Sequence, residues 1–381
     1  MVKIVVLGYG RIGSAIVDTL TSSKIVSGIG VCDSNYDVIK DLSKEKIEVF
    51  HIDVHDKNIL VRVMKEYDIA VCALPSYLGF KVEEAAIEAG VDLVDVSYMS
   101  EDPFSLDARA RDAGITIVPD CGVAPGLSNM LIGLGFQEFD KVDSIKILVG
   151  SLPQNPIPPL EYIITWSSED LLEEYTRPVR IIENGTLKYV NPLTGIELID
   201  FEGLGVFEAF YTDGLRTLLK TLNGKVEYMC EKTLRYPGHA EKILFLKEIG
   251  MLDEEPLDVD GVKMVPRKFL ARLLEKRLGA RDRDMLLLRV MLKGVKNSST
   301  FSKIFQVIDM YDVEKNVTAL SRTTAYTATG TALLLGMKMV KEKGILPPEI
   351  IGFNKRYMEY LLNYLEERKI SIKEMESFEY K

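Results

Sequence analysis

Residues 3–13 read KIVVLGYGRIG, and this stretch decides the fold of the first part of the chain. The apolar run Lys3–Leu7 is typical of a strand buried on both faces, and glycines follow it with the spacing GxGxxG. In that spacing Gly8 permits a tight turn, Gly10 lets the backbone approach a pyrophosphate, and Gly13 lets the next helix pack closely on the strand. Because the N-terminus of a helix offers N–H groups to an anion, the stretch predicts a dinucleotide-binding turn.

A carboxylate, Asp33, follows the second expected strand, 20 residues after Gly13. It can accept hydrogen bonds from both hydroxyls of an adenosine ribose and would repel a 2′-phosphate. Residues 34–36 are Ser, Asn and Tyr, with no Arg or Lys, so the sequence favours NAD over NADP as the cofactor. With the ends of the following strands, the residues expected to bind the cofactor are Gly8, Gly10, Arg11, Ile12, Gly13, Asp33, Asp53, Val54, Leu74, Pro75, Ser97 and Tyr98.

The first 120 residues alternate short apolar runs with segments of helical periodicity, which is typical of an α/β fold with a doubly wound parallel sheet, the Rossmann type. After Gly126 strands follow one another with few helices, and Val226–Leu234 alternates apolar and polar residues. This pattern predicts a second, α+β domain with a mixed or antiparallel sheet. The expected strands of the first part are Lys3–Leu7, Ser27–Cys32, Ile47–Ile52, Ile69–Ala73, Leu93–Val96 and Thr116–Val118.

The composition excludes several classes of protein. A chain of 381 residues predicts two domains, and 47 Lys and Arg against 57 Asp and Glu give a net charge of -10, which argues against partners such as nucleic acid or an anionic membrane. Four cysteines without CxxC spacing fit free thiols in a reducing compartment. His51 and His55 lack a nearby third ligand, so we expect no metal site. Without a signal peptide or a long apolar run, we expect a soluble, cytoplasmic protein.

Five further motifs carry a resemblance to a known family. They are PDCGVAPGLSN at 119–129, PPLEY at 158–162, EAFYTDGLRTL at 208–218, LRYPGHAEK at 234–242 and RTTAYT at 322–327. Together with the glycine turn they resemble the saccharopine dehydrogenase superfamily, and within it most closely the lysine 6-dehydrogenases. The motifs span about residues 1–345, and PPLEY together with RYPGHAEK is more specific than GVAPG.

The resemblance implies an enzyme of lysine metabolism. The implied reaction is NAD-dependent oxidation of the ε-amine of L-lysine to 2-aminoadipate 6-semialdehyde and ammonia, and the product cyclises to a piperideine carboxylate. It also implies a homodimer, with residues 1–123 and 320–345 forming the NAD-binding domain and its returning helix. Residues 124–319 would form the substrate and dimerisation domain, and residues 346–381 a C-terminal helical extension.

Two alternatives stay open. The glutamate-forming saccharopine reductases have an Asp where this chain has Ala124, and residues 212–216 replace their NRDS-like motif, which weakens the resemblance to them. A non-catalytic NADH-sensing protein of the same fold is the other alternative. Tyr98 matches a tyrosine that those reductases also carry.

Oxidation of an amine requires a base, because hydride abstraction needs a neutral amine and the pKa of a lysine ammonium is about 10.4. His239 is the only histidine of the expected second domain and is the expected base, and Glu241 is expected either to orient it or to act through water during imine hydrolysis. A structural histidine bonded to a backbone carbonyl is the alternative. Tyr98 and Asp120, at the ends of two expected strands, complete the expected catalytic residues.

The substrate's own charged groups call for partners. An arginine guanidinium can bind the α-carboxylate with two parallel hydrogen bonds, and the candidates are Arg216 first, then Arg235 and Arg322. The alternative role for each arginine is an ion pair that holds loops together. Carboxylates suit the α-ammonium, and the candidates are Glu161 and Asp213, with Asp120 as a further one.

Overall fold

The computed structural model describes residues 1–279 and 283–379, and the chain divides into two compact units. The first unit comprises Met1–Gln137 and Ser321–Ser371, and the second comprises Glu138–Leu320 and Ile372–Lys381. The chain therefore leaves the first unit and returns to it. Its boundary falls after Gln137 rather than after residue 123, and residues 346–371 belong to the first unit instead of forming a separate extension.

The first unit contains a seven-stranded parallel sheet. Its strands are β1 (Val2–Leu7), β2 (Val26–Asp33), β3 (Ile47–His51), β4 (Ile69–Cys72), β5 (Asp92–Asp95), β6 (Thr116–Val118) and β17 (Gly344–Ile345). Their order is β17-β6-β5-β4-β1-β2-β3, so the order reverses beside β1, which makes the gap between β1 and β4 a topological switch point. The doubly wound α/β class is confirmed, and each of the six expected strands overlaps an observed one.

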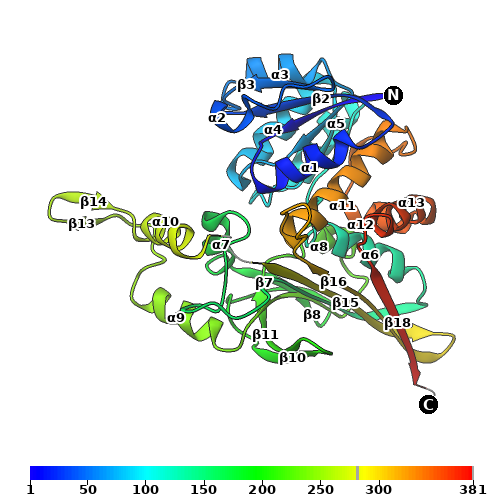
Figure 1. Ribbon diagram of the computed structural model, residues 1–381. Coiled ribbons are helices and arrows are strands. Elements are labelled where there is room, and N and C mark those ends of the chain that lie inside the picture. The colour runs from blue at the N-terminus through cyan, green and yellow to red at the C-terminus, as the bar shows by residue number, and fades with distance from the viewer. Residues whose placement is uncertain (280–282, 380–381) are drawn as a thin grey trace. The chain divides into compact units, whose positions relative to one another are not determined.

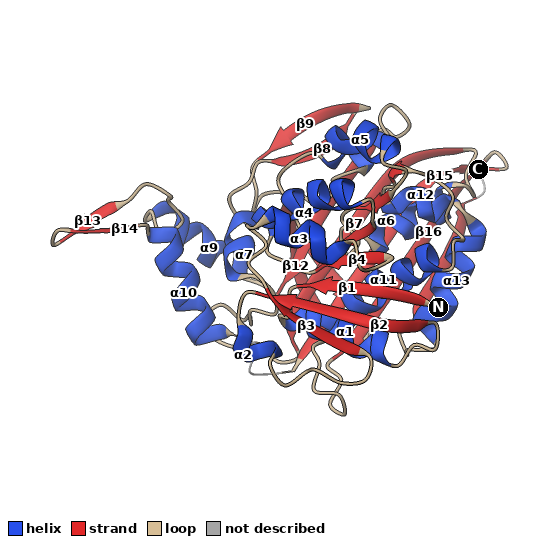
Figure 2. Cartoon of the chain, turned by 90° about the horizontal axis from the view of Figure 1, so that it is seen from above, coloured by secondary structure: helices blue, strands red, loops and turns tan. Residues whose placement is uncertain are grey.

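The first unit also contains helices, several of which cover the two faces of this sheet. They are α1 (Arg11–Thr21), α2 (Tyr36–Ile39), α3 (Lys57–Met64), α4 (Ser76–Ala89), α5 (Asp107–Asp112), preceded by the 3-10 turn Pro103–Leu106, α6 (Leu127–Phe136), α11 (Ala319–Gly336), α12 (Pro348–Phe353) and α13 (Lys355–Glu366). Helices α3 and α4 pack on one face and α1 on the other (Figures 1 and 2). The small residues of α11 let it approach closely, because a Cβ at Gly336 would lie 3.2 Å from the side chain of Val2. Most of helix α11 lies in the segment Ser321–Ser371, which belongs to the first unit.

The second unit is built on a nine-stranded mixed sheet. Its strands are β7 (Lys141–Pro153), β8 (Val179–Glu183), β9 (Thr186–Val190), β10 (Glu197–Phe201), β11 (Gly205–Thr212), β12 (Tyr228–Arg235), β15 (Asp284–Lys296), β16 (Ser299–Met310) and β18 (Ile372–Glu379). The main order is β10-β11-β12-β7-β15-β16-β18, with β8 beside β12 and β9 beside β8. Strands β12 and β7 run parallel and the other pairs antiparallel, so the expected mixed sheet is confirmed.

Four helices and a separate hairpin complete the second unit. They are α7 (Ser168–Glu174), α8 (Leu218–Thr221), α9 (His239–Glu248), α10 (Pro266–Leu278), β13 (Leu257–Val259) and β14 (Val262–Met264). The end of the chain, which the sequence predicts to be helical, instead forms the strand β18, because it pairs with β16 along eight residues from Thr300 to Val307. All four cysteines are buried free thiols, and no helix in the described part of the chain is long and apolar enough to cross a membrane.

Candidate functional site

The glycine turn between β1 and α1 lies at the switch point of the first sheet. Gly8 has a φ of 95°, and its N–H donates to the carbonyl of Cys32 at 2.8 Å. A Cβ at Gly8 would lie 2.6 Å from the carbonyl oxygen of Ala73, and a Cβ at Gly13 would lie 2.0 Å from that of Gly8. No described atom lies within 4 Å of a Cβ at Gly10. The fold therefore requires Gly8 and Gly13, whereas Gly10 leaves open the side from which a phosphate reaches the start of α1.

Asp33 ends β2 beside this turn. Its Oδ2 accepts the N–H of Tyr9 at 2.7 Å, and its Oδ1 accepts the N–H of Asn35 at 2.8 Å. Each carboxylate oxygen has a second lone pair, so both can still accept a hydroxyl group. Two backbone bonds thus fix a half-exposed carboxylate in the position that suits a ribose.

The ends of β3 and β4 carry the other expected cofactor residues. Asp53 is exposed, and its Oδ1 accepts the N–H of His55 at 2.9 Å, while Val54 is half-buried. A methyl group of Leu74 lies 3.1 Å from the position of a Cβ at Gly8, and Pro75 is the N-cap residue of α4. The residues of the first unit therefore fit a dinucleotide along the carboxyl ends of β1 to β4.

A buried carboxylate, Asp95, ends β5 and is not among the site residues expected from the sequence. Its Oδ1 accepts the N–H of Ser97 and its Oδ2 accepts the Ser97 hydroxyl, both at 2.8 Å. Burial raises the pKa of Asp95 to about 6, and the negative charge of Asp120 acts in the same direction. Asp120 is itself buried, with a φ of 52°, and Tyr98 is half-buried. The ends of β5 and β6 thus bring two acids close together, a pattern that favours a functional site.

The PDCGVAPGLSN segment is held by the C-terminal part of the first unit. The Asn129 side-chain oxygen accepts the N–H of Gly126 at 3.3 Å and the hydroxyl of Ser128 at 3.0 Å. Its amide nitrogen donates to the buried carboxylate of Glu349 in α12 at 3.1 Å. Because Glu349 lies 220 residues away along the chain, no local pattern could have revealed this partner.

His239 is buried at the first residue of α9. Its Nδ1 lies 2.8 Å from the carbonyl oxygen of Leu160, and its Nε2 lies 2.9 Å from the hydroxyl of Tyr175. Burial, together with the charge of Arg235, lowers the pKa of His239 to about 3. The imidazole ring therefore stays neutral, and both of its nitrogens form hydrogen bonds. These contacts favour the alternative given above, a structural histidine, over a catalytic base. Glu241 is exposed and is not a partner of the ring.

Arg235 is also enclosed by its own unit. Its guanidinium lies 4.5 Å from the centre of the Tyr162 ring, and its Nε donates to the Tyr175 hydroxyl at 3.2 Å. Its Nη1 donates to the carbonyl of Leu234 at 2.9 Å, and its Nη2 pairs with Glu174 at 3.4 Å. Each of the three guanidinium nitrogens has a partner within the second unit. These contacts are typical of an arginine that positions the loops around it.

The expected acidic residues of the second unit have cations beside them. Asp213 is buried and accepts a bidentate pair of bonds from Arg180, with Nε at 2.9 Å and Nη2 at 2.7 Å. Glu161 forms an ion pair with Lys242, the last residue of the LRYPGHAEK motif. Arg180 lies 33 residues from Asp213 along the chain, so no short spacing in the sequence reveals this pair.

The two remaining arginine candidates lie in different units. Arg216 is buried in the loop after β11, with a φ of 51°. Arg322 is buried in α11, in the part of that helix that belongs to the first unit.

The two most specific motifs pack on each other. Leu160 and Glu161 of PPLEY contact His239 and Lys242 of LRYPGHAEK. A third motif supplies Glu208, whose carboxylate accepts the N–H groups of Gly238 at 2.8 Å and Ala240 at 2.6 Å, and so caps the start of α9. The motifs therefore build one hydrogen-bonded core of the second unit.

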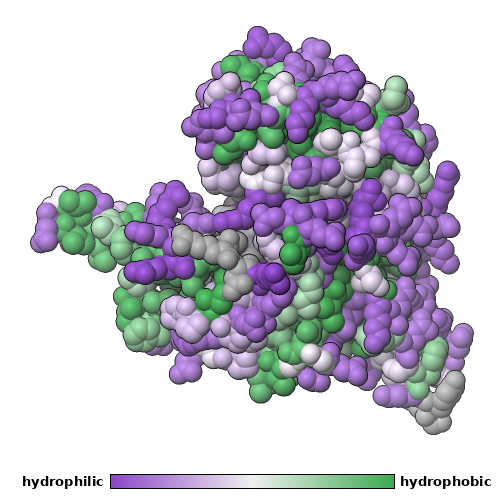
Figure 3. All heavy atoms as spheres, viewed as in Figure 1, coloured by the Kyte–Doolittle hydropathy of each residue, from purple (hydrophilic) through white to green (hydrophobic). Residues whose placement is uncertain are grey.

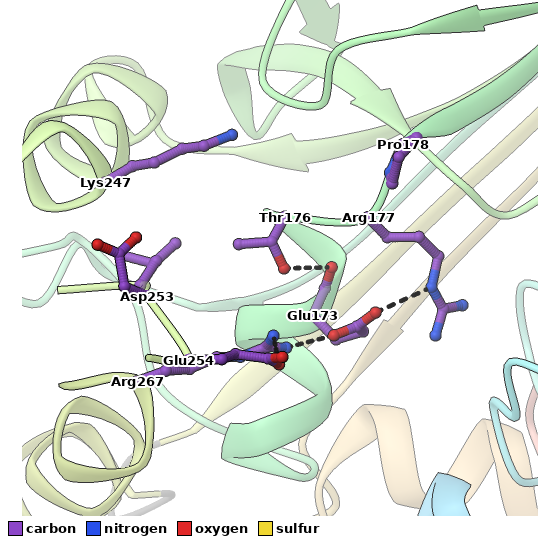
Figure 4. A pocket seen from close by; sticks show the side chains of 9 residues that line it. Glu173, Thr176, Arg177, Pro178, Lys247, Asp253, Glu254 and Arg267 are labelled. Carbon is purple, nitrogen blue, oxygen red and sulfur yellow. Dashed lines mark hydrogen bonds and ion pairs between the residues drawn. The ribbon is translucent and has the colours of Figure 1, made fainter. Parts of the chain in front are cut away.

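A polar pocket of about 400 Å³ opens in the second unit between α7, α9 and α10 (Figure 4). Glu173 pairs there with Arg177 at 3.3 Å and with Arg267, which also pairs with Glu254 at 2.6 Å. Although burial alone would raise it, the hydrogen bonds and charges of these two arginines hold the pKa of Glu173 below its usual value. Most of the charged side chains of the pocket thus form ion pairs with one another. None of the expected site residues lines the pocket.

Comparisons with known proteins match both the N-terminal part of the chain and the part that follows it. The model of the saccharopine dehydrogenase NADP binding domain matches residues 4–118, and that of the saccharopine dehydrogenase C-terminal domain matches residues 122–370. The mitochondrial alpha-aminoadipic semialdehyde synthase of Bos taurus is 25% identical over 274 residues, which are 66% of this chain and 29% of that protein. The NADP(+), L-glutamate-forming saccharopine dehydrogenase of Saccharomyces cerevisiae is 24% identical over 267 residues, which are 68% of this chain and 60% of that protein.

The chain thus spans less than two thirds of the length of these curated relatives. A solved structure of the L-Glu-forming saccharopine dehydrogenase from Saccharomyces cerevisiae, without ligand, has a TM-score of 0.81 at 20% identity and covers 99% of this chain and 100% of that one. This likeness shows the fold. Because the C-terminal domain model alone matches more than half of the residues, this chain belongs to the saccharopine dehydrogenase family.

Proposed function

We propose that the protein is a nicotinamide-dependent dehydrogenase that breaks a carbon–nitrogen bond, and that its reaction is the NAD-dependent oxidative deamination of the ε-amine of L-lysine. The observation that carries the proposal is the edge of the first sheet. This edge combines the open glycine turn, Asp33 and the two buried acids Asp95 and Asp120. The names of the relatives, a saccharopine dehydrogenase and an aminoadipic semialdehyde synthase, support chemistry on lysine-derived amines.

The proposed reaction converts a lysine ε-ammonium, NAD⁺ and water into an aldehyde, ammonium, NADH and one proton. The bound cofactor supplies the hydride acceptor. The ε-ammonium must lose a proton before its carbon gives up hydride. Asp95 and Asp120 offer a negative environment that attracts the ammonium and can receive its proton. His239 stays neutral in this proposal and positions Arg235 through Tyr175, while Tyr98 and Glu241 remain candidate catalytic residues.

The residues proposed to bind the substrate follow from its charges. Arg216 stays the proposed partner of the α-carboxylate, as the first arginine candidate of the sequence, whereas Arg235 is enclosed by Tyr162, Tyr175 and Glu174 of its own unit. Glu161 is the proposed partner of the α-ammonium, because it is only half-buried and its ion-pair partner Lys242 is partly exposed, whereas Asp213 is buried and holds Arg180 by two bonds. A related basic amino acid would satisfy the same charges.

The second candidate is a glutamate-forming saccharopine dehydrogenase. The names of several relatives and the NADP in the description of the matching cofactor domain favour it. Ala124 and residues 212–216, which differ from the motifs of those enzymes, favour the lysine reaction.

An assay of the purified protein separates the two candidates. With L-lysine and NAD at alkaline pH we expect NADH and ammonia to form in equal amounts. Oxidation of NADPH in the presence of glutamate and aminoadipate semialdehyde, without activity on lysine, would support the second candidate. Cofactor binding without either activity would support a non-catalytic protein that senses NADH.

A further inference from the structure

The polar pocket between α7, α9 and α10 has no part in the proposed reaction. No residue proposed to bind the cofactor or the substrate lines it, and all of its lining residues belong to the second unit. Its volume of about 400 Å³ lies within the range of pockets that bind small molecules, about 300–1,000 Å³. We call it the α9 pocket.

Six charged side chains line the α9 pocket, and their charges sum to zero. In the space-filling view, hydrophilic residues gather over α10, which forms one wall (Figure 3). Four of the six form a chain of ion pairs, in which Glu173 joins two arginines and Arg267 also holds Glu254. The side chains of Arg177 and Arg267 are only 14% and 13% exposed, so this chain forms a fixed wall of the pocket.

The other two charged side chains, Lys247 and Asp253, have opposite signs. Within residues 1–279 and 283–379, neither side chain has an ion-pair or hydrogen-bond partner. Lys247 lies in the last turn of α9, and Asp253 lies in the loop that follows this helix. Figure 4 shows Lys247 extending from α9 over the pocket. The pocket therefore offers one cation and one anion whose charges its own residues do not neutralise.

The acceptor groups of the pocket are held in place by the backbone. The N–H of Asp253 donates to the carbonyl of Gly250 at 3.2 Å, and its carbonyl accepts the N–H of Arg267 at 3.1 Å. Gly250 has a φ of 81°, and a Cβ there would lie 3.0 Å from Oδ2 of Asp253. The hydroxyl of Thr176 donates to backbone carbonyls of α7 at 3.1 and 3.3 Å, so its oxygen can still accept a hydrogen bond.

We propose that the α9 pocket is a second ligand site, which binds a free α-amino acid with an uncharged side chain. The carboxylate of the amino acid faces Lys247, and its ammonium faces Asp253 and the Thr176 oxygen. Because the charges of the lining sum to zero, a zwitterion adds no surplus charge to the site. A ligand of one sign alone would leave Lys247 or Asp253 without a partner.

The α9 pocket shares two helices with the conserved hydrogen bonds around Arg235. Glu174, which pairs with Arg235, directly follows Glu173 of the pocket wall in α7. Helix α9 begins with His239, and its last turn carries Lys247. An amino acid in the pocket therefore stabilises the segments that hold Arg235 and His239 in place.

The first test is a titration by saturation-transfer NMR with three small probes. L-alanine, propionate and ethylamine each carry one methyl group, and propionate lacks the ammonium while ethylamine lacks the carboxylate. We expect the full-length protein, without cofactor or lysine, to bind L-alanine about fivefold or more tightly than either of the others. The result is independent of the proposed reaction. Absence of L-alanine binding overturns the proposal, and so does equally tight binding of propionate, which would indicate a simple anion site.

Variants show whether the binding occurs in the α9 pocket. Lys247→Met and Asp253→Asn should each weaken L-alanine binding by about fivefold or more, because each removes one charge contact. The matched controls are Lys263→Met and Asp260→Asn, which replace exposed residues of the hairpin β13–β14 outside the pocket. They should bind L-alanine as the wild type does, and thermal unfolding shows that every variant is folded. Equal binding by the pocket variants and the controls overturns the proposal.

The second test locates the bound amino acid by hydrogen–deuterium exchange. The amides of Ile249, Gly250 and Met251 donate to carbonyls of the last turns of α9, so their exchange reports on this end of the helix. Saturating L-alanine should slow exchange in residues 247–254 by about twofold or more, and the same concentration of propionate should not. Asp253→Asn protein should show no slowing. Slowing that is confined to other segments, or none at all, overturns the proposal.

Discussion

Asp33 is the residue on which the proposed choice of cofactor depends. It ends β2, two backbone N–H groups hold its carboxylate, and residues 34–36 contain no cation. A 2′-phosphate at this position would face a fixed negative charge.

We therefore expect the wild-type protein to bind NADH more tightly than NADPH. The Asp33→Ser variant should lose roughly tenfold or more of its affinity for NADH, because a hydrogen bond to a charged group contributes about 1.5–3 kcal/mol. NADPH affinity should rise in the same variant because the repulsion is gone. Fluorescence titration with both cofactors measures this. Asp68→Ser is the control, because Asp68 accepts the N–H of Lys3 at the opposite end of β1. Tighter binding of NADPH by the wild-type protein would contradict the expectation.

His239 shows what a sequence cannot reveal about a single residue. Its position after Gly238 and its ordinary pKa favour a base, yet its two partners, Leu160 and Tyr175, are 79 and 64 residues away. The glycine turn and Asp33, in contrast, stand out in the sequence, because the functions expected of them depend on short spacings along the chain.

The lowered pKa of His239 predicts a specific dependence of stability on pH. The unfolded chain takes up a proton near pH 6.5, whereas the folded protein resists it until about pH 3, so this contribution is present above pH 6.5 and lost as the pH falls. Between pH 7.5 and 5.0 the loss amounts to roughly 2 kcal/mol. His239→Gln should lack it, and urea unfolding of both proteins at the two pH values measures the difference. An equal pH dependence in both would mean that His239 titrates normally in the folded protein.

At the scale of elements, the buried parallel strands were the easiest to predict. Runs such as Ile69–Cys72 are apolar on both faces and therefore stand out in the sequence. The strands β9 and β18 were missed because most of their side chains are exposed or charged, and only pairing with β8 and β16 makes them strands.

The turn between β1 and α1 allows a prediction that separates folding from binding. A Cβ at Gly10 meets open space, so Gly10→Ala should keep the wild-type melting temperature and lose cofactor affinity by about tenfold, because the methyl group occupies the approach of the phosphate. A Cβ at Gly13 would lie 2.0 Å from a backbone oxygen, so Gly13→Ala should be destabilised by about 1–3 kcal/mol or more. Calorimetry and titration of both variants measure the two effects. Unchanged cofactor binding by Gly10→Ala would show that the phosphate lies elsewhere.

For the whole molecule, the mixed sheet of the second unit follows from the change of pattern after Gly126, whereas the discontinuous first unit was implied only by the family resemblance. The exact boundary and the place of residues 346–371 do not follow from the sequence pattern, because they depend on α6 and α12 packing together. At Gly133 and Gly352 the two helix backbones approach so closely that a Cβ would lie 2.2 Å from a carbonyl oxygen. Contacts of that kind leave no periodic signal in the sequence.

The net negative charge of the chain is a property of the whole molecule that bears on the proposed substrate. A net charge of -10 suits a cationic substrate, and the cluster of Asp95 and Asp120 concentrates negative charge at one sheet edge. Asp95→Asn should therefore raise the KM for lysine several-fold and leave NADH binding nearly unchanged. Steady-state kinetics and a cofactor titration test this together, and an unchanged KM would remove Asp95 from the proposed site.

The fate of the ε-nitrogen tests the central proposal most directly. L-lysine labelled with ¹⁵N at the ε position is incubated with the protein and NAD, and the products are analysed by mass spectrometry. The proposed reaction predicts that labelled ammonium forms in the same amount as NADH and that the α-nitrogen stays in the cyclised product. Absence of NADH with lysine, together with NADP-dependent cleavage of saccharopine to glutamate, would contradict it.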